Sequence, residues 1–194
     1  IERSQHISPR HNPFFEHGRT QLFPAVRDNR PLGRISAQVD DLRLVRYQDA
    51  TGMFGFLDGF DDREGFSALF AAAENWLKAQ GMTRVIGPFG FTINEEAGLL
   101  VDGFEHPPVI FTSHAAPYYE AHVETAGYKR IKDLLAYDFD SSKELPDGLA
   151  RMLTKVHATG DLEVRPLSKK NLDRDLAILI DIVNDAWSDN WGFT

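Results

Sequence analysis

Cysteine is absent from the chain, and this absence excludes disulfide bonds and thiolate metal sites. An excess of positive charge is also missing, because the formal net charge is −8 at pH 7. Such a chain has no overall field with which to collect phosphates. Nucleic acid is therefore not expected as a partner, and redox chemistry does not identify the compartment.

Long apolar runs are missing as well. No stretch approaches the roughly 18 apolar residues of a membrane span, and no basic, then apolar, then small-residue leader opens the sequence. We therefore expect neither a membrane partner nor a secretory signal, and a cytoplasmic location is the default expectation. What is present is a chain of 194 residues, 42% hydrophobic and 11% aromatic, which is enough for one good core.

The first part of the chain predicts an arm followed by strands. Residues 1–20 are polar and punctuated by proline, and two phenylalanines are their main anchors, so we expect an extended arm. Apolar runs on either side of residues 28–30 predict a β-hairpin over 21–40. A third apolar run predicts a strand near 53–60.

Residues 62–80 predict a helix that packs on these strands. Gly81 supplies a stop signal, and a further strand is predicted near 84–91. Strand, acidic loop, helix and strand in this order form a βαβ unit. The segment 92–117 is irregular and long, as lids and binding loops often are. The apolar residues at helical spacing are Phe66, Leu69, Phe70, Ala73 and Leu77.

The last third of the chain alternates helix and connector. A short helix is expected to end at Gly127, and the run "KDLLAYDFD" is expected to return to the sheet. A helix-like linker over 141–160 and a fresh strand, "DLEVRPL", come next. The helix over 170–187 then carries an apolar stripe that a soluble monomer rarely leaves bare. We expect it to pack on the first module, on another chain, or on residues beyond an incomplete C-terminal end.

The order of these elements resembles the GNAT superfamily of acyl-CoA N-acyltransferases. The segments "GPFGFTINEEAGLLVDGFEHPP", "APYYEAHVETAGYKR" and "KDLLAYDFD" are similar to a mostly uncharacterised group of bacterial GNAT-like proteins. The resemblance implies an α/β (α+β) fold with a mixed, twisted β-sheet flanked by helices. It places a GNAT-like module at 21–140, a linker at 141–160, and the first strand and helix of a second, incomplete GNAT-like module at 161–194.

The loop before the predicted helix departs from the pattern of that superfamily. GNAT enzymes hold the pyrophosphate of coenzyme A on the backbone of a Q/R-x-x-G-x-G/A loop. Matching the helix starts places Asp61, Glu64 and Phe66 at the Gln/Arg, middle-glycine and final small-residue positions. We therefore expect this chain to bind no cofactor at this loop. The resemblance allows acetyl-CoA or another acyl-CoA in the complete protein.

The same acidic residues have two other interpretations. Asp61 followed three residues later by Glu64 fits a capping box, in which side chains bind the free N–H groups of the first helical turn. Oxygen ligands from Asp58, Asp61 and Asp62 suit Mg²⁺ or Ca²⁺, although their spacing matches no recognised metal loop. We favour the cap and predict no metal site.

The groups that move protons in GNAT enzymes are also altered. The position of the usual tyrosine, four residues before the glycine of the closing motif, is Val123 here. Its neighbour His122 is interpreted as an exposed helix residue. The remaining catalytic candidates are His114, which precedes the next helix, and Tyr118 and Tyr119 at that helix's start. The tyrosines equally fit structural packing, because their rings are apolar and their tips polar.

Two functions of different classes remain. The first is an N-acyltransferase that moves an acyl or aminoacyl group to a small-molecule amine or a peptide, with the donor held by the second module. The second is a non-catalytic GNAT-like module that binds a ligand or supports its neighbour. The altered loop and the missing tyrosine favour the second function for this module, while the tandem layout favours the first for the complete protein.

Overall fold

The computed structural model describes residues 7–138, 140, 142–160 and 165–193. The chain divides into two units, one that ends at Asp133 and also includes Asn190–Thr194, and one formed by Leu134–Asp189. Within the described residues, no helix combines the length and the apolar character that crossing a membrane requires.

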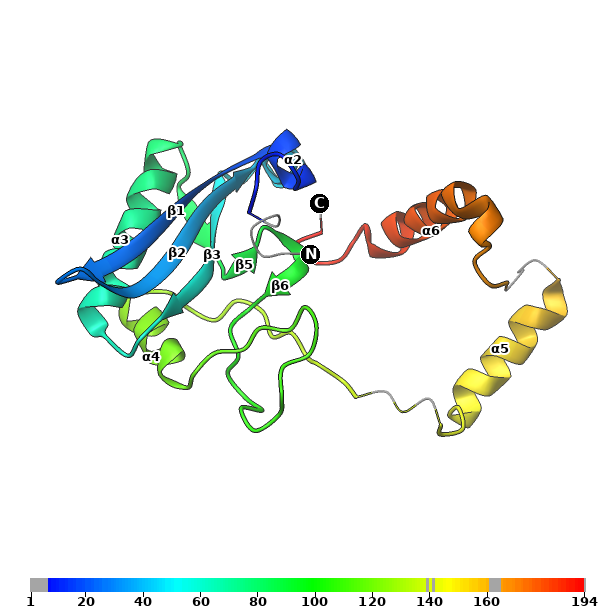
Figure 1. Ribbon diagram of the computed structural model, residues 1–194. Helices are drawn as coiled ribbons and strands as arrows, with labels where there is room; N and C mark the ends of the chain where they lie inside the picture. Colours follow the sequence, from blue (N-terminus) through cyan, green and yellow to red (C-terminus); the bar gives the residue numbers. More distant parts are fainter. Residues whose placement is uncertain (1–6, 139, 141, 161–164, 194) are drawn as a thin grey trace. The chain divides into compact units, whose positions relative to one another are not determined.

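The first unit is built on a twisted, open, four-stranded mixed sheet (Figure 1). The strand order is β1-β2-β3-β4, with antiparallel pairs up to β3 and a parallel pair between β3 and β4. Asp28 and Asn29 connect β1 to β2 in left-handed conformations, φ 49° and 60°, which suit a tight hairpin turn. The predicted hairpin is therefore confirmed. The strands are β1 (Gly18–Arg27), β2 (Arg30–Asp40), β3 (Thr51–Gly59) and β4 (Arg84–Ile86).

The predicted extended arm is wrong for residues 13–20. Pro13–Glu16 form a short 3₁₀ helix, η1, and β1 already begins at Gly18. Phe14 is buried and stacks on Phe91 with the ring centroids 4.5 Å apart. The aromatic side chain supplies enough apolar surface to hold this segment on the sheet. The beginning of the predicted arm, residues 1–6, lies outside the described residues.

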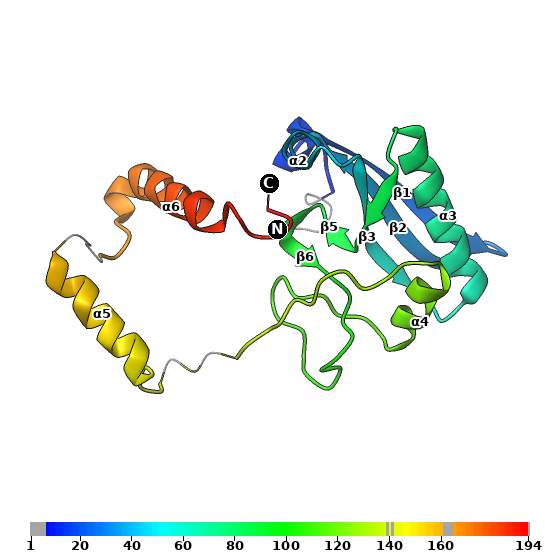
Figure 2. The same ribbon diagram turned by 180° about the vertical axis from the view of Figure 1, so that it is seen from behind.

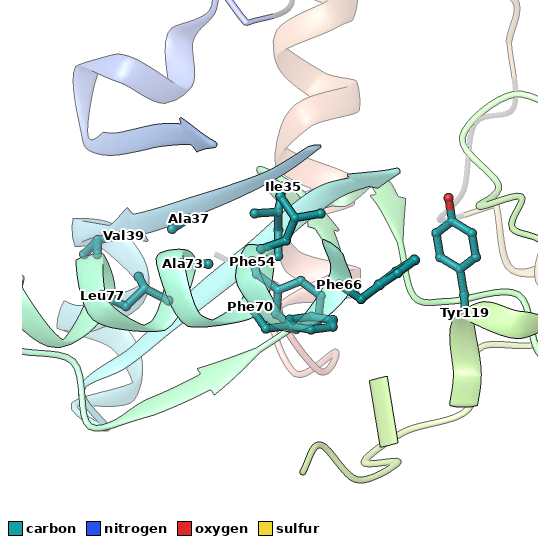
Figure 3. Close-up of a cluster of buried hydrophobic side chains, with 10 residues drawn as sticks. Ile35, Ala37, Val39, Phe54, Phe66, Phe70, Ala73, Leu77 and Tyr119 are labelled. Carbon is teal, nitrogen blue, oxygen red and sulfur yellow. The ribbon is translucent and has the colours of Figure 1, made fainter. Parts of the chain in front are cut away.

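Helix α3 (Arg63–Ala79) covers one face of the sheet, as both ribbon views show (Figure 2). Its bounds lie within one residue of the predicted helix at each end, because Asp62 is the N-cap and Gln80 the C-cap. The predicted βαβ unit is confirmed by the parallel pairing of β3 with β4. The main core lies between helix and sheet (Figure 3) and contains Ile35, Ala37, Val39, Phe54, Phe66, Leu69, Phe70, Ala73 and Leu77.

The opposite face of the sheet is covered by a separate two-stranded sheet, β5 (Phe89–Gly90) and β6 (Thr92–Ala97). The fully buried Gln38 donates from Nε2 to the carbonyl oxygen of Phe89 at 2.8 Å. The prediction of one strand over 84–91 is wrong, since Pro88 has no N–H to continue the ladder and divides it. Gly55 of β3 lets β5 approach closely, because a Cβ at this position would lie 1.6 Å from the carbonyl oxygen of Phe89.

Two further helices complete the first unit. The helices are α2 (Asp41–Tyr47) and α4 (Tyr118–Thr125), and α4 is followed by Gly127 with φ 94°, as predicted for a helix stop.

The expectation that "KDLLAYDFD" returns to the sheet is wrong for the described part, residues 132–138. These residues form no strand, and their apolar side chains are exposed. A β4 of only three residues offers few backbone groups for a further strand to pair with.

The second unit contains α5 (Asp147–Thr159), the 3₁₀ turn η2 (Lys169–Asn171) and α6 (Leu172–Trp187). The helices predicted within 141–160 and near the C-terminal end are thus confirmed, while the role of 141–160 as a linker between modules stays a prediction. The predicted strand "DLEVRPL" falls mostly on residues 161–164, outside the described residues, and residues 165–167 are not a strand.

A buried carboxylate fixes the start of α6. Asp175 accepts two hydrogen bonds from Arg165, at 2.8 and 2.9 Å, and one from the backbone N–H of Ser168 at 2.8 Å. Arg174 also donates to it. These bonds, those from Arg165 first, hold the pKa of Asp175 well below its usual range.

Candidate functional site

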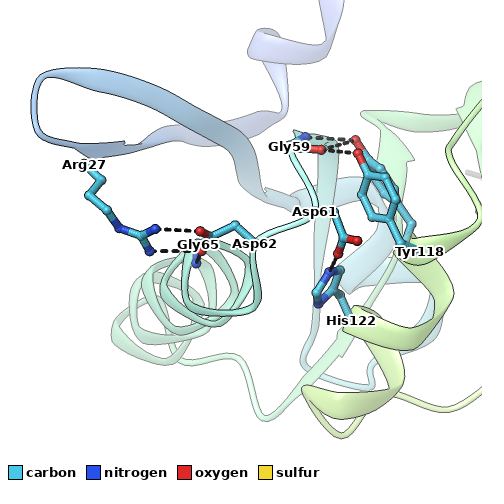
Figure 4. Close-up of polar contacts among 8 residues, drawn as sticks. Arg27, Gly59, Asp61, Asp62, Gly65, Tyr118 and His122 are labelled. Atoms are coloured by element: carbon cyan, nitrogen blue, oxygen red, sulfur yellow. Dashed lines mark hydrogen bonds and ion pairs between the residues drawn. The ribbon is translucent and has the colours of Figure 1, made fainter.

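A polar junction of the first unit lies where β3 ends and α3 begins. Gly59 ends β3, Asp61 and Asp62 follow it, and the first turn of α4 packs alongside (Figure 4). Two segments about 60 residues apart in sequence are thereby joined, because both tyrosines of α4 bond to the backbone of Gly59.

Tyr118 and Tyr119 clamp α4 to the end of β3. The hydroxyl of Tyr118 donates to the carbonyl oxygen of Gly59 at 2.8 Å. The hydroxyl of Tyr119 accepts from the Gly59 N–H at 2.8 Å and lies 3.1 Å from Oδ1 of Asp58, to which it can donate. Burial raises the pKa of Tyr119 to about 12, and the nearby Asp58 carboxylate adds to this rise. Tyr119 is therefore a poor proton donor in the folded chain.

His114 is not joined to this clamp. It lies on the loop before α4 with an exposed side chain. Among the described residues, no hydrogen bond connects it to Tyr118 or Tyr119. The structure thus brings two of the three predicted catalytic residues together and leaves the third outside. Whether any of them takes part in catalysis stays a prediction.

The interpretation of His122 as an exposed helix residue is wrong. Only 12% of its side chain is exposed, and Nε2 lies 2.8 Å from Oδ1 of Asp61. Its ring also stacks on that of Phe66, with centroids 4.3 Å apart and the planes 10° apart. A carboxylate that orients an imidazole is a common arrangement for moving protons. Because Nε2 faces Asp61, exchange with a substrate would use Nδ1.

A sequence signal for this pair existed. His122 follows Tyr118 by four residues, and side chains at this spacing share one face of a helix. The face that carries the tyrosines therefore also carries the histidine. The partner, Asp61, is 61 residues away, and only the tertiary fold identifies it.

The first turn of α3 is already occupied by side chains. Asp62, not Asp61 as predicted, is the N-cap, and its Oδ1 accepts from the N–H of Gly65 at 2.7 Å. Glu64 does not reach back to complete a capping box. It instead shares Arg27 with Asp62, at 2.9 and 2.6 Å. The hydrogen bond from Arg27, followed by that from Gly65, holds the pKa of Asp62 below its usual range.

This arrangement does not fit a pyrophosphate. Carboxylates surround the helix start, one of its N–H groups is bonded to Asp62, and Arg27 is committed to two of the acids. An open hollow lies next to it, lined by Arg63, Glu64 and the small side chains of the next two turns. The described residues also contain no group of three or more His, Asp or Glu placed to hold a metal ion.

Comparison with known proteins adds an independent line of observation. No protein-family model and no solved structure matches the chain. It is 43% identical, over its whole length, to half of a protein named bacterial ceramide synthase from Caulobacter vibrioides. It is 39% identical, again over its whole length, to 49% of the protein YghO from Escherichia coli. The chain therefore spans about half the length of the curated relatives that it matches.

Proposed function

We propose that this chain is part of an N-acyltransferase that joins an acyl group to the amino group of a long-chain amino alcohol, as in ceramide formation. The observation that carries the proposal is that the whole chain is 43% identical to half of a protein named bacterial ceramide synthase. The GNAT-like order of elements supports the same reaction class, because GNAT enzymes transfer acyl groups to amines. The relatives are twice as long, so the proposed activity belongs to the complete protein.

The chemistry is amide formation. The amine nitrogen attacks the carbonyl carbon of an acyl thioester, the C–N bond forms, and the C–S bond breaks to release a thiol. The amine gives up a proton, and the thiolate takes one up. A positioned base typically contributes about 10²–10⁴-fold to such a step.

In this proposal, His122 is the group that accepts the proton from the amine, and Asp61 holds its ring. The distance of 2.8 Å and the low exposure of the histidine support this role. Tyr118 and Tyr119 position α4, and therefore His122, through their bonds to Gly59. His114 stays a candidate for contact with the acceptor from its exposed loop.

The donor is proposed to bind outside the first turn of α3. Like charges about 4 Å apart repel by on the order of 1 kcal/mol even in water, and by more near a protein surface. Calorimetric titration of acetyl-CoA into the chain is expected to give no measurable binding. Micromolar binding of acetyl-CoA would contradict the proposal for this loop if the variant Gly65→Asp, which adds a negative charge at the same turn, abolished that binding.

The test of the function uses the protein expressed from its complete gene. It is incubated with a saturated long-chain amino alcohol and a fatty acyl-CoA, and the N-acyl product is measured by mass spectrometry. Product is expected, and His122→Ala is expected to lower kcat by about 10²–10⁴-fold. His106→Ala is the matched control, because His106 is an exposed loop histidine, and it should leave kcat unchanged.

The possible failures can be distinguished. If the complete protein forms no amide from either long-chain or short-chain amines, the acyltransferase proposal is wrong. If product forms equally well with His122→Ala, the function stands and the role of His122 is wrong.

A second candidate is a non-catalytic module that supports a catalytic neighbour. The observation in its favour is that both tyrosine hydroxyls and the N-terminus of α3 are engaged in structural hydrogen bonds. Under this alternative, His122→Ala would lower the melting temperature of the complete protein without a specific loss in kcat.

A further inference from the structure

The chain leaves the first unit after Asp133 and returns to it at Asn190. Both ribbon views place this returning end beside β5 and β6 (Figures 1 and 2). We call the segment Trp191–Phe193 the returning strap. The ring of Trp191 lies 5.9 Å from that of Phe89, and Phe193 is 8% exposed. A strap of three residues thus carries one ring contact, between Trp191 and Phe89, and a second aromatic side chain that is buried.

The surface beneath the strap is apolar and is formed by three separate strands. Trp191 packs on a small cluster formed by Met53 of β3, Ile86 of β4 and Phe89 of β5. This cluster is distinct from the main core on the α3 side of the sheet. The part of the indole that lies on this surface is removed from water, and this burial of apolar area stabilises the contact against the cost of ordering the chain.

The backbone of the strap is also held. The hydroxyl of Tyr47 at the end of α2 donates to the carbonyl oxygen of Phe193 at 3.1 Å. Gly192 has φ 78°, a left-handed conformation that favours glycine and lets the chain turn between the two aromatic side chains. It also lies on the side chain of Ile93, because a Cβ added there would be 3.6 Å from it.

The strap closes a small cavity next to a buried arginine. The cavity of about 10 Å³ is lined by Asp40, Arg43, Thr92 and Gly192, together with apolar side chains, and it has room for a single water molecule. Arg43 is 7% exposed, and its Nε has no hydrogen-bond partner among the described residues. Its guanidinium lies over the ring of Tyr47, with Cζ 4.4 Å from the ring centroid. Tyr47 therefore touches both the strap and the arginine.

We propose that the first unit carries a docking groove for an aromatic-glycine-aromatic peptide, and that its occupant is the strap of the same chain. Docking makes residues 134–189 a loop that is tied to the first unit at both ends. The strap also closes the Arg43 cavity, so release of the strap opens that cavity to solvent. This inference does not depend on the proposed acyltransferase function.

The test makes Trp191 the only tryptophan of the full chain, with Trp76→Phe and Trp187→Phe. Trp191 is expected to emit at shorter wavelength than in urea and to be several-fold less accessible to acrylamide quenching. Adding Phe193→Ala is expected to shift the emission to longer wavelength and to increase quenching several-fold. Phe60→Ala is the matched control, because Phe60 is 67% exposed on the same unit, and it should change neither signal.

A second variant guards against general damage to the fold. Gly192→Val keeps both aromatic side chains but disfavours the left-handed conformation, so it should also release Trp191 while the circular dichroism stays that of the parent. The proposal is overturned if Trp191 of the native chain is quenched as strongly as in urea. It is equally overturned if Phe193→Ala and Gly192→Val both leave Trp191 protected.

Discussion

Helices α3 and α6 are similar in sequence character and opposite in environment. They have 17 and 16 residues, and both carry apolar side chains at helical spacing. On α3 these side chains are buried against the sheet, whereas Leu172, Leu176, Leu179 and Val183 of α6 are between 38 and 45% exposed. Periodicity therefore predicts that a helix forms and which face is apolar. Only a second surface decides whether that face is buried.

The buried residue of α6 sharpens the contrast. It is the carboxylate Asp175, held by hydrogen bonds from Arg165 and Ser168, and not an apolar side chain. Helix α3 is fixed by its apolar face, while the start of α6 is fixed by polar contacts close in sequence. Local polar contacts need no distant partner, so they hold even where the apolar face is bare.

The largest expected effect comes from truncating an apolar side chain on each helix. Phe70→Ala on α3 should lower the free energy of unfolding by about 3–5 kcal/mol, because it leaves a cavity beside Phe54 and Tyr128. Leu179→Ala on α6 should change it by less than about 0.5 kcal/mol at protein concentrations low enough for the chain to be a monomer. Urea unfolding followed by fluorescence measures both. Equal losses would mean that α6 is packed on a partner surface.

The next prediction concerns what covers α6. We propose that its apolar face packs on further residues of the complete protein or on another chain. The chain alone should therefore associate with itself as concentration rises, and Leu179→Glu should return it to a monomer in light scattering. Asp181→Ala on the same helix is the control and should not dissociate it. A monodisperse monomer at every concentration, with α6 still helical, would contradict the proposal.

A smaller and local effect is expected at Asp175. Asp175→Asn should speed amide hydrogen exchange over the first turns of α6 at neutral pH, while the neighbouring exposed Asp173→Asn should not. The folded-state pKa of Asp175 is lowered, so its stabilisation is present above the ordinary aspartate value of about 3.9 and is lost as pH falls below it. The difference in helix content between Asp175→Asn and its parent should therefore disappear in acid. A difference that persists there would refute the charge interaction.

A further local effect is expected at the tyrosine clamp. Tyr119→Phe should cost about 1 kcal/mol of folding free energy, the usual value for a hydrogen bond. Since its folded-state pKa is raised to about 12 from 10.0, the stabilisation is complete below pH 10 and is lost as pH rises toward 12. An alkaline titration of phenolate absorbance should lose a late component in Tyr119→Phe, and Tyr137→Phe, at a residue that is 82% exposed, is the matched control. If the pKa of Tyr119 stayed at its ordinary value of 10.0, the hydroxyl would be solvated and the clamp would be contradicted.

Much of the local structure was determined by the sequence alone. The hairpin with Asp28 and Asn29 at its turn, helix α3 with its stop at Gly81, and helix α6 all follow from short-range rules of periodicity, turns and helix stops. These features form because neighbouring residues favour them. The predicted N-cap was off by one residue, and the predicted capping box does not form, because the roles of Asp61, Asp62 and Glu64 depend on distant partners, Arg27 and His122.

Tertiary structure alone decided the long-range features. It left residues 132–138 outside the sheet and brought His122 to Asp61 across 61 residues. It also returned Trp191 to a cluster on β3, β4 and β5. The physical reason is the same in each case. Local sequence sets which conformations a segment favours. The favourable energy of contacts between distant groups is gained only when the whole chain has folded, and it then selects among those conformations.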